Sequence, residues 1–129
     1  MVGSSNACEV VIEFGGGLEA LTINQTKRVN LKILDDSITI AQLIAYVRRT
    51  VFGAKRDLFA NPPEVEAKRC CEVAVEGDVQ GVLNKAETAS VRAGVLVLVD
   101  DIDWELLGGG NHVLNRVTNV FFISSLHGG

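Results

Sequence analysis

The chain of 129 residues contains 16 acidic residues and 12 lysines or arginines, which gives a formal net charge of −4. Its length predicts a single domain, and its hydrophobic share of 47% argues against disorder throughout the chain. A protein that holds nucleic acid by itself normally carries a basic face, because contacts to phosphates dominate that affinity. No basic face is visible in this sequence, so we expect no direct binding of nucleic acid.

Targeting segments, disulfides and metal sites are also not expected. The start of the chain does not resemble a signal peptide, and no apolar run approaches the ~20 residues of a membrane span. Three cysteines, Cys8, Cys70 and Cys71, make an odd number that fits a reducing cytoplasm better than a disulfide framework. Because adjacent cysteines rarely bridge comfortably, we interpret Cys70 and Cys71 as unreactive loop thiols. His112 and His127 do not lie at ligand spacing from a cysteine pair, which makes a zinc site improbable.

Two strands are expected before residue 34. Residues 8–14 alternate between apolar and mostly polar positions, which predicts a strand with one buried side. The glycines at 15–17 end it and are interpreted as a turn, because they lack the GxGxxG spacing and the following helix of a phosphate loop. Residues 27–33 alternate again, so we expect a second strand that pairs antiparallel with the first.

The clearest element is a helix over residues 39–52. Its apolar stripe follows the i, i+3, i+4, i+7 spacing and consists of Ile40, Leu43, Ile44, Val47 and Val51. Thr39 and Gln42 match a capping box at its start. Arg48 and Arg49 lie in the last turns, where cations complement the helix dipole.

Residues 61–89 differ in character from the segments before them. Six acidic residues face three basic ones, so this segment alone carries a net charge of −3 (3 − 6), most of the −4 of the chain. A Pro-Pro pair near its start is followed by no periodicity of more than a few residues. We interpret 61–89 as a long acidic surface insertion that is mobile and peripheral, although residues 70–75 could form a short strand.

The next segment predicts a hairpin. Residues 95–99 are uniformly apolar, as expected for a strand buried on both faces. Residues 100–103 supply turn chemistry, and 104–106 are expected to start the return strand, which the glycines at 108–110 end. Trp104 is interpreted as a half-exposed packing residue, although a lone tryptophan on a hairpin could serve a partner.

The last expected strand covers residues 119–123. Two strands, a helix, a hairpin and a final strand suit an α+β fold of the β-grasp (ubiquitin-like) type, a mixed sheet packed on one main helix. We therefore expect one domain over 1–129, with a flexible Gly-Gly tail over 124–129. The expected core consists of Val10, Ile12, Leu31, Ile40, Leu43, Ile44, Val47, Leu96 and Phe122.

The tail itself suggests a chemical role. On this fold the last strand lies in the middle of the sheet, and the residues after it form an arm that carries an α-carboxylate. With a pKa of about 3.3–3.7 such a group is ionised at neutral pH and is a poor electrophile, so acyl transfer requires prior activation. Glycine has no Cβ and leaves its carbonyl unhindered. The protein would be a substrate and would need no catalytic group of its own.

Three stretches of the sequence resemble the ubiquitin-related modifiers, a family of ubiquitin-like proteins that also act as sulfur carriers. They are VIEFGGG (11–17), VLVLVDDIDWELLG (95–108) and FISSLHGG (122–129). The resemblance covers nearly the whole chain except about 61–89, and the glycine-rich LLGGGN (106–111) also departs from the family pattern. It implies a terminal glycine that an activating enzyme adenylates and converts to a thiocarboxylate.

The resemblance also implies the site and its partners. Gly129 would be the thiocarboxylate and isopeptide site, with Gly128, His127 and Leu126 recognised by the activating enzyme, an adenylyltransferase-sulfurtransferase. That partner uses ATP, and no cofactor is expected on this chain. Further implied partners are a cytosolic tRNA thiolase complex, which receives sulfur for 2-thiouridine at the wobble position, and lysines of target proteins. These roles imply a cytoplasmic protein that is not an enzyme.

Two other classes of function stay open. A sulfur carrier for molybdopterin or thiamin synthesis also has a β-grasp fold and a Gly-Gly end, although LHGG and the DWELLG hairpin favour the first interpretation. A non-covalent β-grasp interaction module would make the terminal glycines incidental. An enzyme is the weakest alternative, because no nucleophile–base pair or paired carboxylates occur at recognisable spacing.

Overall fold

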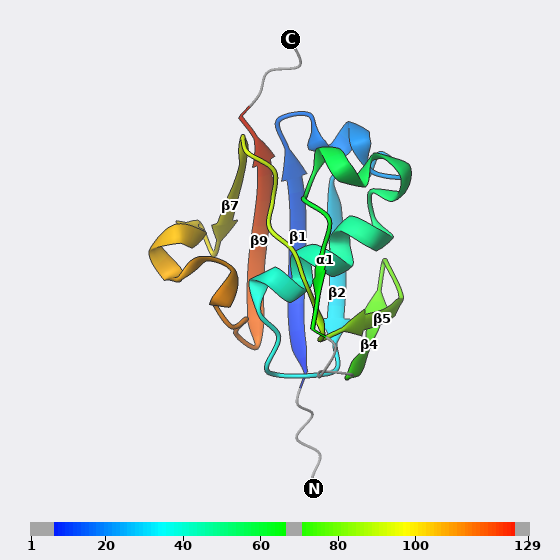
Figure 1. Cartoon of the computed structure of the whole chain (residues 1–129), viewed down its shortest axis with the longest axis vertical. Helices are drawn as coiled ribbons and strands as arrows, with labels where there is room; N and C mark the ends of the chain where they lie inside the picture. The colour runs from blue at the N-terminus through cyan, green and yellow to red at the C-terminus, as the bar shows by residue number, and fades with distance from the viewer. Residues whose placement is uncertain (1–6, 67–70, 126–129) are drawn as a thin grey trace, which may run out of the picture.

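One mixed sheet and one main helix organise the molecule, as the sequence predicts (Figure 1). The computed structural model describes residues 7–66 and 71–125. The sheet has seven strands in the order β5-β4-β2-β1-β9-β7-β8, and a second sheet consists of β3 and β6. The helix α1 (Ile40–Thr50) lies across one face of the large sheet.

The remaining elements are short or belong to the two sheets. The strands are β1 (Cys8–Gly15), β2 (Arg28–Ile33), β3 (Glu64–Val65), β4 (Glu72–Gly77), β5 (Gly81–Asn84), β6 (Glu87–Thr88), β7 (Val95–Val99), β8 (Ile102–Asp103) and β9 (Val117–Ser124). Four 3-10 helical turns complete the described chain: η1 (Leu18–Leu21), η2 (Gly53–Leu58), η3 (Trp104–Leu107) and η4 (Gly109–Asn111).

The three central strands follow the predicted alternation. β1 pairs antiparallel with β2, with Val10 opposite Leu31, and parallel with β9, with Phe14 opposite Phe122. The inward residues of β1 are at most 4% exposed, whereas its outward glutamates are exposed. Because successive side chains of a strand point to opposite faces, the period-2 pattern alone sets which side meets the helix. The antiparallel pairing and the central place of the last strand are confirmed.

The helix begins as predicted and ends earlier. The Thr39 side chain accepts a hydrogen bond from the Gln42 backbone N–H, and the Gln42 side chain accepts one from Thr39, which completes the capping box. Every residue of its apolar stripe is buried. The last helical residue is Thr50. Arg48 in the last turn is itself buried. Its charge is satisfied there because its guanidinium donates to the Ala60 carbonyl and pairs with Asp57.

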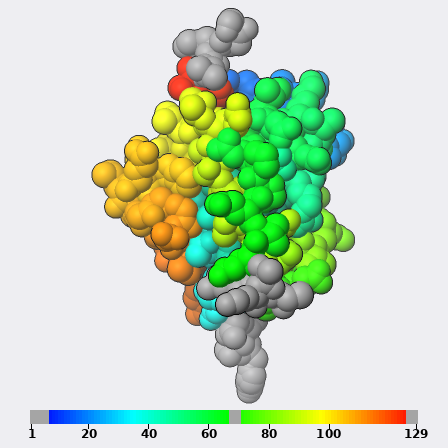
Figure 2. All heavy atoms as spheres, in the orientation of Figure 1, coloured from blue at the N-terminus to red at the C-terminus, as the bar shows by residue number. Residues whose placement is uncertain are grey.

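Two segments cover the side of α1 that faces away from the sheet. Ala60 pairs with Val91 in an isolated bridge, and the Asn61 N–H donates to the Ser90 carbonyl. Ala89 in turn donates to the carbonyl of Ala41 in the first turn of the helix. The space-filling view shows these two segments side by side over this face, residues around 60 in green and residues around 90 in yellow-green to yellow (Figure 2). The buried helix thus lies between the sheet and this second, irregular layer.

The prediction that β7 is buried on both faces is wrong. Val97 and Val99 are buried beneath the helical layer, but Leu96 is 48% exposed. The cause is that α1 covers only one face of the sheet, so the residues of β7 that point to the other face keep contact with solvent. Leu96 therefore does not belong to the core, while the other eight residues of the expected core do.

The predicted return strand at 104–106 is also wrong. The hairpin exists, but its second strand β8 has two residues, with Leu98 opposite Asp103. The Asp103 side chain accepts a hydrogen bond from the Glu105 N–H and starts the turn η3 in place of a strand. Aspartate favours such local hydrogen bonds to the backbone over a sheet ladder. Here this preference of Asp103 outweighs the apolar, strand-like character of residues 104–106.

The expectation of a peripheral insertion fails for most of residues 61–89. β4 pairs antiparallel with β2, with Ile33 opposite Val75, and β5 pairs with β4 to extend the sheet by a hairpin. Val73, Val75 and Leu83 are at most 5% exposed. In β4 the inward positions alternate with exposed acidic or small ones, and this pattern is short enough to be hidden by the high acidity of the segment.

Candidate functional site: the end of the last strand

The end of β9 is held by strands on both sides. Ile123 lies opposite Gly15 of β1, and Ser124 lies opposite Val95 of β7. The end of β1, the start of β7 and the end of β9 therefore meet at one end of the sheet, where the described chain leaves the fold (Figure 1). This exit is the place from which the predicted site residues depart.

Ser125 is fixed beyond the last ladder pair. Its N–H and its hydroxyl both donate to the carbonyl oxygen of Gly94, at N···O 2.6 Å and O···O 2.8 Å. Gly94 itself adopts a positive φ of 94° immediately before β7. A left-handed conformation of this kind strongly favours glycine. We call this pair of hydrogen bonds the Ser125–Gly94 clamp.

The glycine turn after β1 supports the exit from the other side. Gly16 has a φ of 67°, and a Cβ at this position would overlap the carbonyl oxygen of Ser124 and lie 2.9 Å from its nitrogen. Only a residue without a side chain permits this close approach to β9. The interpretation of residues 15–17 as a turn is confirmed, and the turn has the additional task of packing against the end of the last strand.

A cluster of aromatic rings lies beneath the exit. Phe122 is fully buried, with its ring centroid 5.9 Å from Phe14 and 5.0 Å from Phe59. Phe52 stacks on Phe59 at a centroid separation of 4.3 Å. Close-packed rings of this kind resist displacement, so the position of Phe122 also fixes the two residues that follow it.

The predicted site residues lie outside the described residues. These are Leu126, His127, Gly128 and Gly129, and the structure gives their point of attachment only. Ser124 and Ser125 do not belong to the flexible tail expected from residue 124, because Ser124 belongs to β9 and Ser125 is clamped. Sequence reasoning missed the roles of Gly16, Gly94 and Ser125. The glycines that flank the expected strands at 8–14 and 95–99 were the available signal for close backbone approach.

Cys8, one of the two described cysteines, contributes no reactive group to the exit. Cys8 is buried at the opposite end of β1, where its Sγ donates to the Asp35 carbonyl at 2.9 Å. Burial, together with the nearby carboxylates of Asp35 and Asp36, raises the pKa of the Cys8 thiol and keeps it neutral. Cys71 is exposed, and Cys70 lies outside the described residues. The interpretation of Cys70 and Cys71 as unreactive stays a prediction.

Metal-binding clusters and membrane-spanning helices are both absent from the described chain, residues 7–66 and 71–125. No group of three or more histidine, cysteine or carboxylate side chains there is placed to hold a metal ion. None of the helices formed by residues 7–66 and 71–125 has the length and apolar character that crossing a bilayer requires.

Comparison with known proteins places these features in a family. Residues 9–129 match the model of Urm1 (Ubiquitin related modifier). Ubiquitin-related modifier 1 homolog 2 of Arabidopsis thaliana is 34% identical over 124 residues, which cover 94% of this chain and 99% of that protein. Ubiquitin-related modifier 1 of Homo sapiens is 34% identical over 121 residues, which cover 93% and 94% of the two chains.

Solved structures give the same architecture. The crystal structure of an Rurm1-related protein from Plasmodium yoelii superposes with a TM-score of 0.75 at 25% identity and covers 93% of this chain and 99% of that one. The small archaeal modifier protein 1 of Methanosarcina acetivorans, at 15% identity and a TM-score of 0.57, covers 95% and 98% and shares the fold. The β-grasp prediction is confirmed.

Proposed function

The chain belongs to the Urm1 (ubiquitin related modifier) family of ubiquitin-like modifiers, and we propose that Gly129 carries the carboxylate through which it acts. The family match carries this proposal, because it extends over residues 9–129 and includes the tail. In this proposal the protein is a sulfur carrier and a covalent modifier rather than an enzyme. An activating enzyme supplies the catalytic groups and the ATP, and no cofactor resides on this chain.

The chemistry begins with activation of an unreactive carboxylate. Attack of the Gly129 carboxylate on the α-phosphate of ATP forms an acyl-adenylate and releases pyrophosphate. A persulfide sulfur of the activating enzyme then attacks the acyl carbon and displaces AMP. Cleavage of the resulting S–S bond by a thiol leaves a thiocarboxylate on Gly129 and a disulfide on the enzyme. In the alternative outcome, a lysine amine of a target protein takes the acyl group as an isopeptide.

The geometry of the exit supports this role. The Ser125–Gly94 clamp holds the backbone up to residue 125, and Gly129 lies four residues beyond it. Four residues span at most about 14 Å when fully extended, so the reactive site of the partner has to approach Ser125 within that distance. Gly128 and Gly129 suit a narrow channel because neither has a Cβ. Leu126 and His127 are proposed as contacts of the activating enzyme.

The downstream acceptors are proposed from the family. The thiocarboxylate passes its sulfur to a cytosolic tRNA thiolase complex, which forms 2-thiouridine at the wobble position. With a net charge of −4, this chain is expected to reach the tRNA through that complex and not by binding it directly. A cytoplasmic location is part of the proposal, because the thiolase complex proposed as the sulfur acceptor is cytosolic.

The test is an intact-mass measurement. The protein is incubated with ATP, a persulfide donor and the activating enzyme, and we expect replacement of one oxygen by sulfur. Variants that lack Gly129, or that carry one extra residue after it, should keep the wild-type melting temperature and acquire no sulfur. Misplacement by one residue greatly exceeds the ~1 Å that already costs catalysis dearly.

A variant of Gly128 tests the narrow channel, and the extended protein gives the result that would contradict the proposal. Gly128→Trp crowds the channel and should slow thiocarboxylation while leaving the melting temperature unchanged. An extended protein that is shown by mass to be untrimmed, and that still acquires sulfur or restores tRNA thiolation in cells, would contradict the proposal. If the wild-type protein acquires sulfur while the truncated and extended variants acquire none and fail to restore tRNA thiolation in cells, the carrier role stands.

A further inference from the structure

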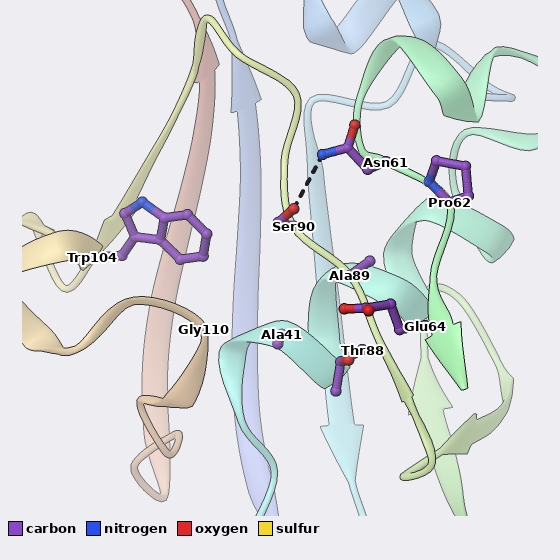
Figure 3. Close-up of a pocket in the computed structure, with 9 residues that line it drawn as sticks. All are labelled: Ala41, Asn61, Pro62, Glu64, Thr88, Ala89, Ser90, Trp104 and Gly110. Carbon is purple, nitrogen blue, oxygen red and sulfur yellow. Dashed lines mark hydrogen bonds between the residues drawn. The ribbon is translucent and has the colours of Figure 1, made fainter. Parts of the chain in front are cut away.

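A groove separate from the exit opens between α1 and the turns that follow β8 (Figure 3). It encloses about 330 Å³, within the size range of pockets that bind small ligands or single side chains. Its walls come from segments far apart in the sequence: the first turn of α1, residues 61–64, residues 88–90, and the turns η3 and η4.

Two side chains face each other across this groove. The indole of Trp104 extends into it from η3, and the Glu64 carboxylate extends toward it from β3 on the other side (Figure 3). Trp104 is half-buried and packs partly against the core, so its packing role is confirmed and part of its ring remains accessible. Among the described residues, none forms a hydrogen bond or ion pair with the exposed Glu64 carboxylate.

The floor of the groove consists of the small residues Ala41, Ala89 and Gly110, which leave space above them. Ala89 donates its N–H to the Ala41 carbonyl at 3.0 Å, which holds the segment against the helix. Gly110 of η4 approaches so closely that a Cβ there would lie 3.0 Å from the Cβ of Ala41. This contact gives a physical reason for part of the glycine-rich stretch 106–111.

Polar groups between the two walls are arranged by a short hydrogen-bond chain. The Arg92 guanidinium donates to the Asn61 side-chain oxygen at 3.2 Å, and the Asn61 amide donates to the Ser90 hydroxyl at 3.1 Å. The Ser90 oxygen accepts from Asn61 with one lone pair and keeps its second lone pair for a donor of the ligand, and the Thr88 hydroxyl also lines the groove. Glu64 is the charged residue among the described lining and gives the groove one carboxylate, opposite Trp104.

From this arrangement we propose that the groove binds an arginine side chain presented by a partner protein. A planar guanidinium stacks on an indole face and is attracted by its quadrupole, and its edge matches a carboxylate. Glu64 accepts from the guanidinium, and the hydroxyls of Thr88 and Ser90 are available to its remaining N–H groups. The ~330 Å³ volume admits one such side chain with its methylene stem.

Charge complementarity favours this occupant over an anionic one. Asp103 and Glu105, both exposed, flank Trp104 along the chain and add negative charge beside its wall. Arg92 is engaged with Asn61 at one end, and Arg49 on α1 pairs with Glu87 at 3.5 Å. A phosphate or carboxylate ligand would therefore meet Glu64 without a free cation among the described lining residues.

The test uses the full chain and a blocked tripeptide, acetyl-Gly-Arg-Gly-amide. Trp104 is the single tryptophan of the sequence, so its fluorescence reports occupation of the groove directly. We expect a saturable change at about millimolar peptide, because one side chain offers few contacts. In parallel, NMR shift changes should centre on the amides of Ala41, Thr88, Ser90 and Gly110.

Matched peptides and protein variants should change the affinity for the arginine peptide by defined factors. The peptide with citrulline, the neutral isostere of arginine, should bind about fivefold more weakly, and Glu64→Gln should weaken the arginine peptide about two- to fivefold. Trp104→Leu, measured by the NMR shifts because it lacks the fluorophore, should weaken it about fivefold, with Trp104→Phe as the variant that keeps a ring if the first unfolds. Glu72→Gln, an exposed acid on β4, should leave binding unchanged.

Any one of five results would overturn the proposal, and four of them concern relative affinity or the place of binding. They are equal binding of the citrulline peptide, unchanged binding to Glu64→Gln, tighter binding of the lysine twin of the peptide, and shift changes centred away from the groove. The absence of any saturable change in fluorescence and NMR would also overturn it. None of these readouts depends on thiocarboxylation, so the outcome is independent of the role proposed for Gly129.

Discussion

The centre of the sheet and its β4–β5 edge are built differently but bury side chains equally well. β1 and β9 have eight residues each and are paired on both sides, whereas β5 has four residues and pairs only with β4. Phe122 in β9 and Leu83 in β5 are nevertheless both 0% exposed. The difference teaches that burial follows from what covers a residue, and not from the length or the net charge of its own segment.

The largest effect is expected at the centre. Phe122→Ala should lower the free energy of unfolding by about 3–5 kcal/mol, because it leaves a cavity among packed rings. Urea unfolding measures this change. Phe121→Ala is the matched control, since its ring lies on the open face of β9 and is only partly buried. An equal loss in the two variants would show that the open face is covered as well as the inner one.

The edge should respond almost as strongly. Leu83→Ala should cost about 2–4 kcal/mol, because the residue is fully buried although its segment is acidic. Its neighbour Val82 is 42% exposed, and Val82→Ala should cost less than about 1 kcal/mol in the same urea titration. A loss below about 0.5 kcal/mol for Leu83→Ala would restore the peripheral interpretation of residues 61–89 and break the comparison.

The part of the fold that could be predicted from the sequence is again the centre of the sheet and not the β4–β5 edge. Long regular patterns, such as the alternation of 8–14 and the stripe of α1, gave correct elements because many residues agree on one periodicity. β4 offers only Val73 and Val75 as inward residues, which is too short a pattern to outweigh the acids Glu72, Glu76 and Asp78 in and beside it. The exposure of Leu96 could not be predicted, because it depends on which face the helix covers.

The residues of the candidate site were predicted from the sequence, but the contacts that hold the end of β9 were not. The tail residues 126–129 follow from the properties of a terminal glycine carboxylate and from resemblance. The Ser125–Gly94 clamp and the approach of Gly16 to Ser124 join residues 31 and 108 positions apart in the sequence. Contacts of that separation are set by strand register, which local patterns specify only after the pairing is known.

A smaller loss is expected where the exit is supported. Gly16→Ala should cost about 2–3 kcal/mol, because it combines a left-handed alanine with overlap on the backbone of Ser124. Gly17, with φ of 99° and no atom within 4 Å of its Cβ position, isolates the backbone strain, so Gly17→Ala should cost about 1 kcal/mol. Thermal melting measures both, and equal losses would show that the contact with Ser124 is relieved cheaply.

The two alanine variants should also separate in function. Gly16→Ala displaces the end of β9 and should lower the rate of thiocarboxylation, whereas Gly17→Ala should retain it. The comparison is made at a temperature where both proteins are folded, as checked by circular dichroism. Retention of the wild-type rate by Gly16→Ala would show that the tail does not depend on a fixed exit.

The smallest effect concerns the ion pair that attaches the hairpin to the end of β2. Lys85, directly after β5, donates to the Asp35 carboxylate at 3.2 Å, and Ser37 donates to it through its N–H and hydroxyl. Burial alone would raise the pKa of Asp35, but the Ser37 hydrogen bonds and Lys85 outweigh it and lower that pKa. A carboxylate whose pKa is lower in the folded state stabilises the fold above its unfolded pKa of about 3.9.

That stabilisation is present at neutral pH and is lost as the pH falls below about 4 through the lowered folded pKa. Asp35→Asn should therefore cost up to about 1 kcal/mol at neutral pH and reduce the difference in urea midpoint between about pH 6 and about pH 3. Asp36→Asn, at an exposed neighbouring position, is the control. If Asp35→Asn retains the full wild-type acid dependence, the hairpin is attached by its buried apolar residues alone, and the ion pair adds nothing measurable to the edge.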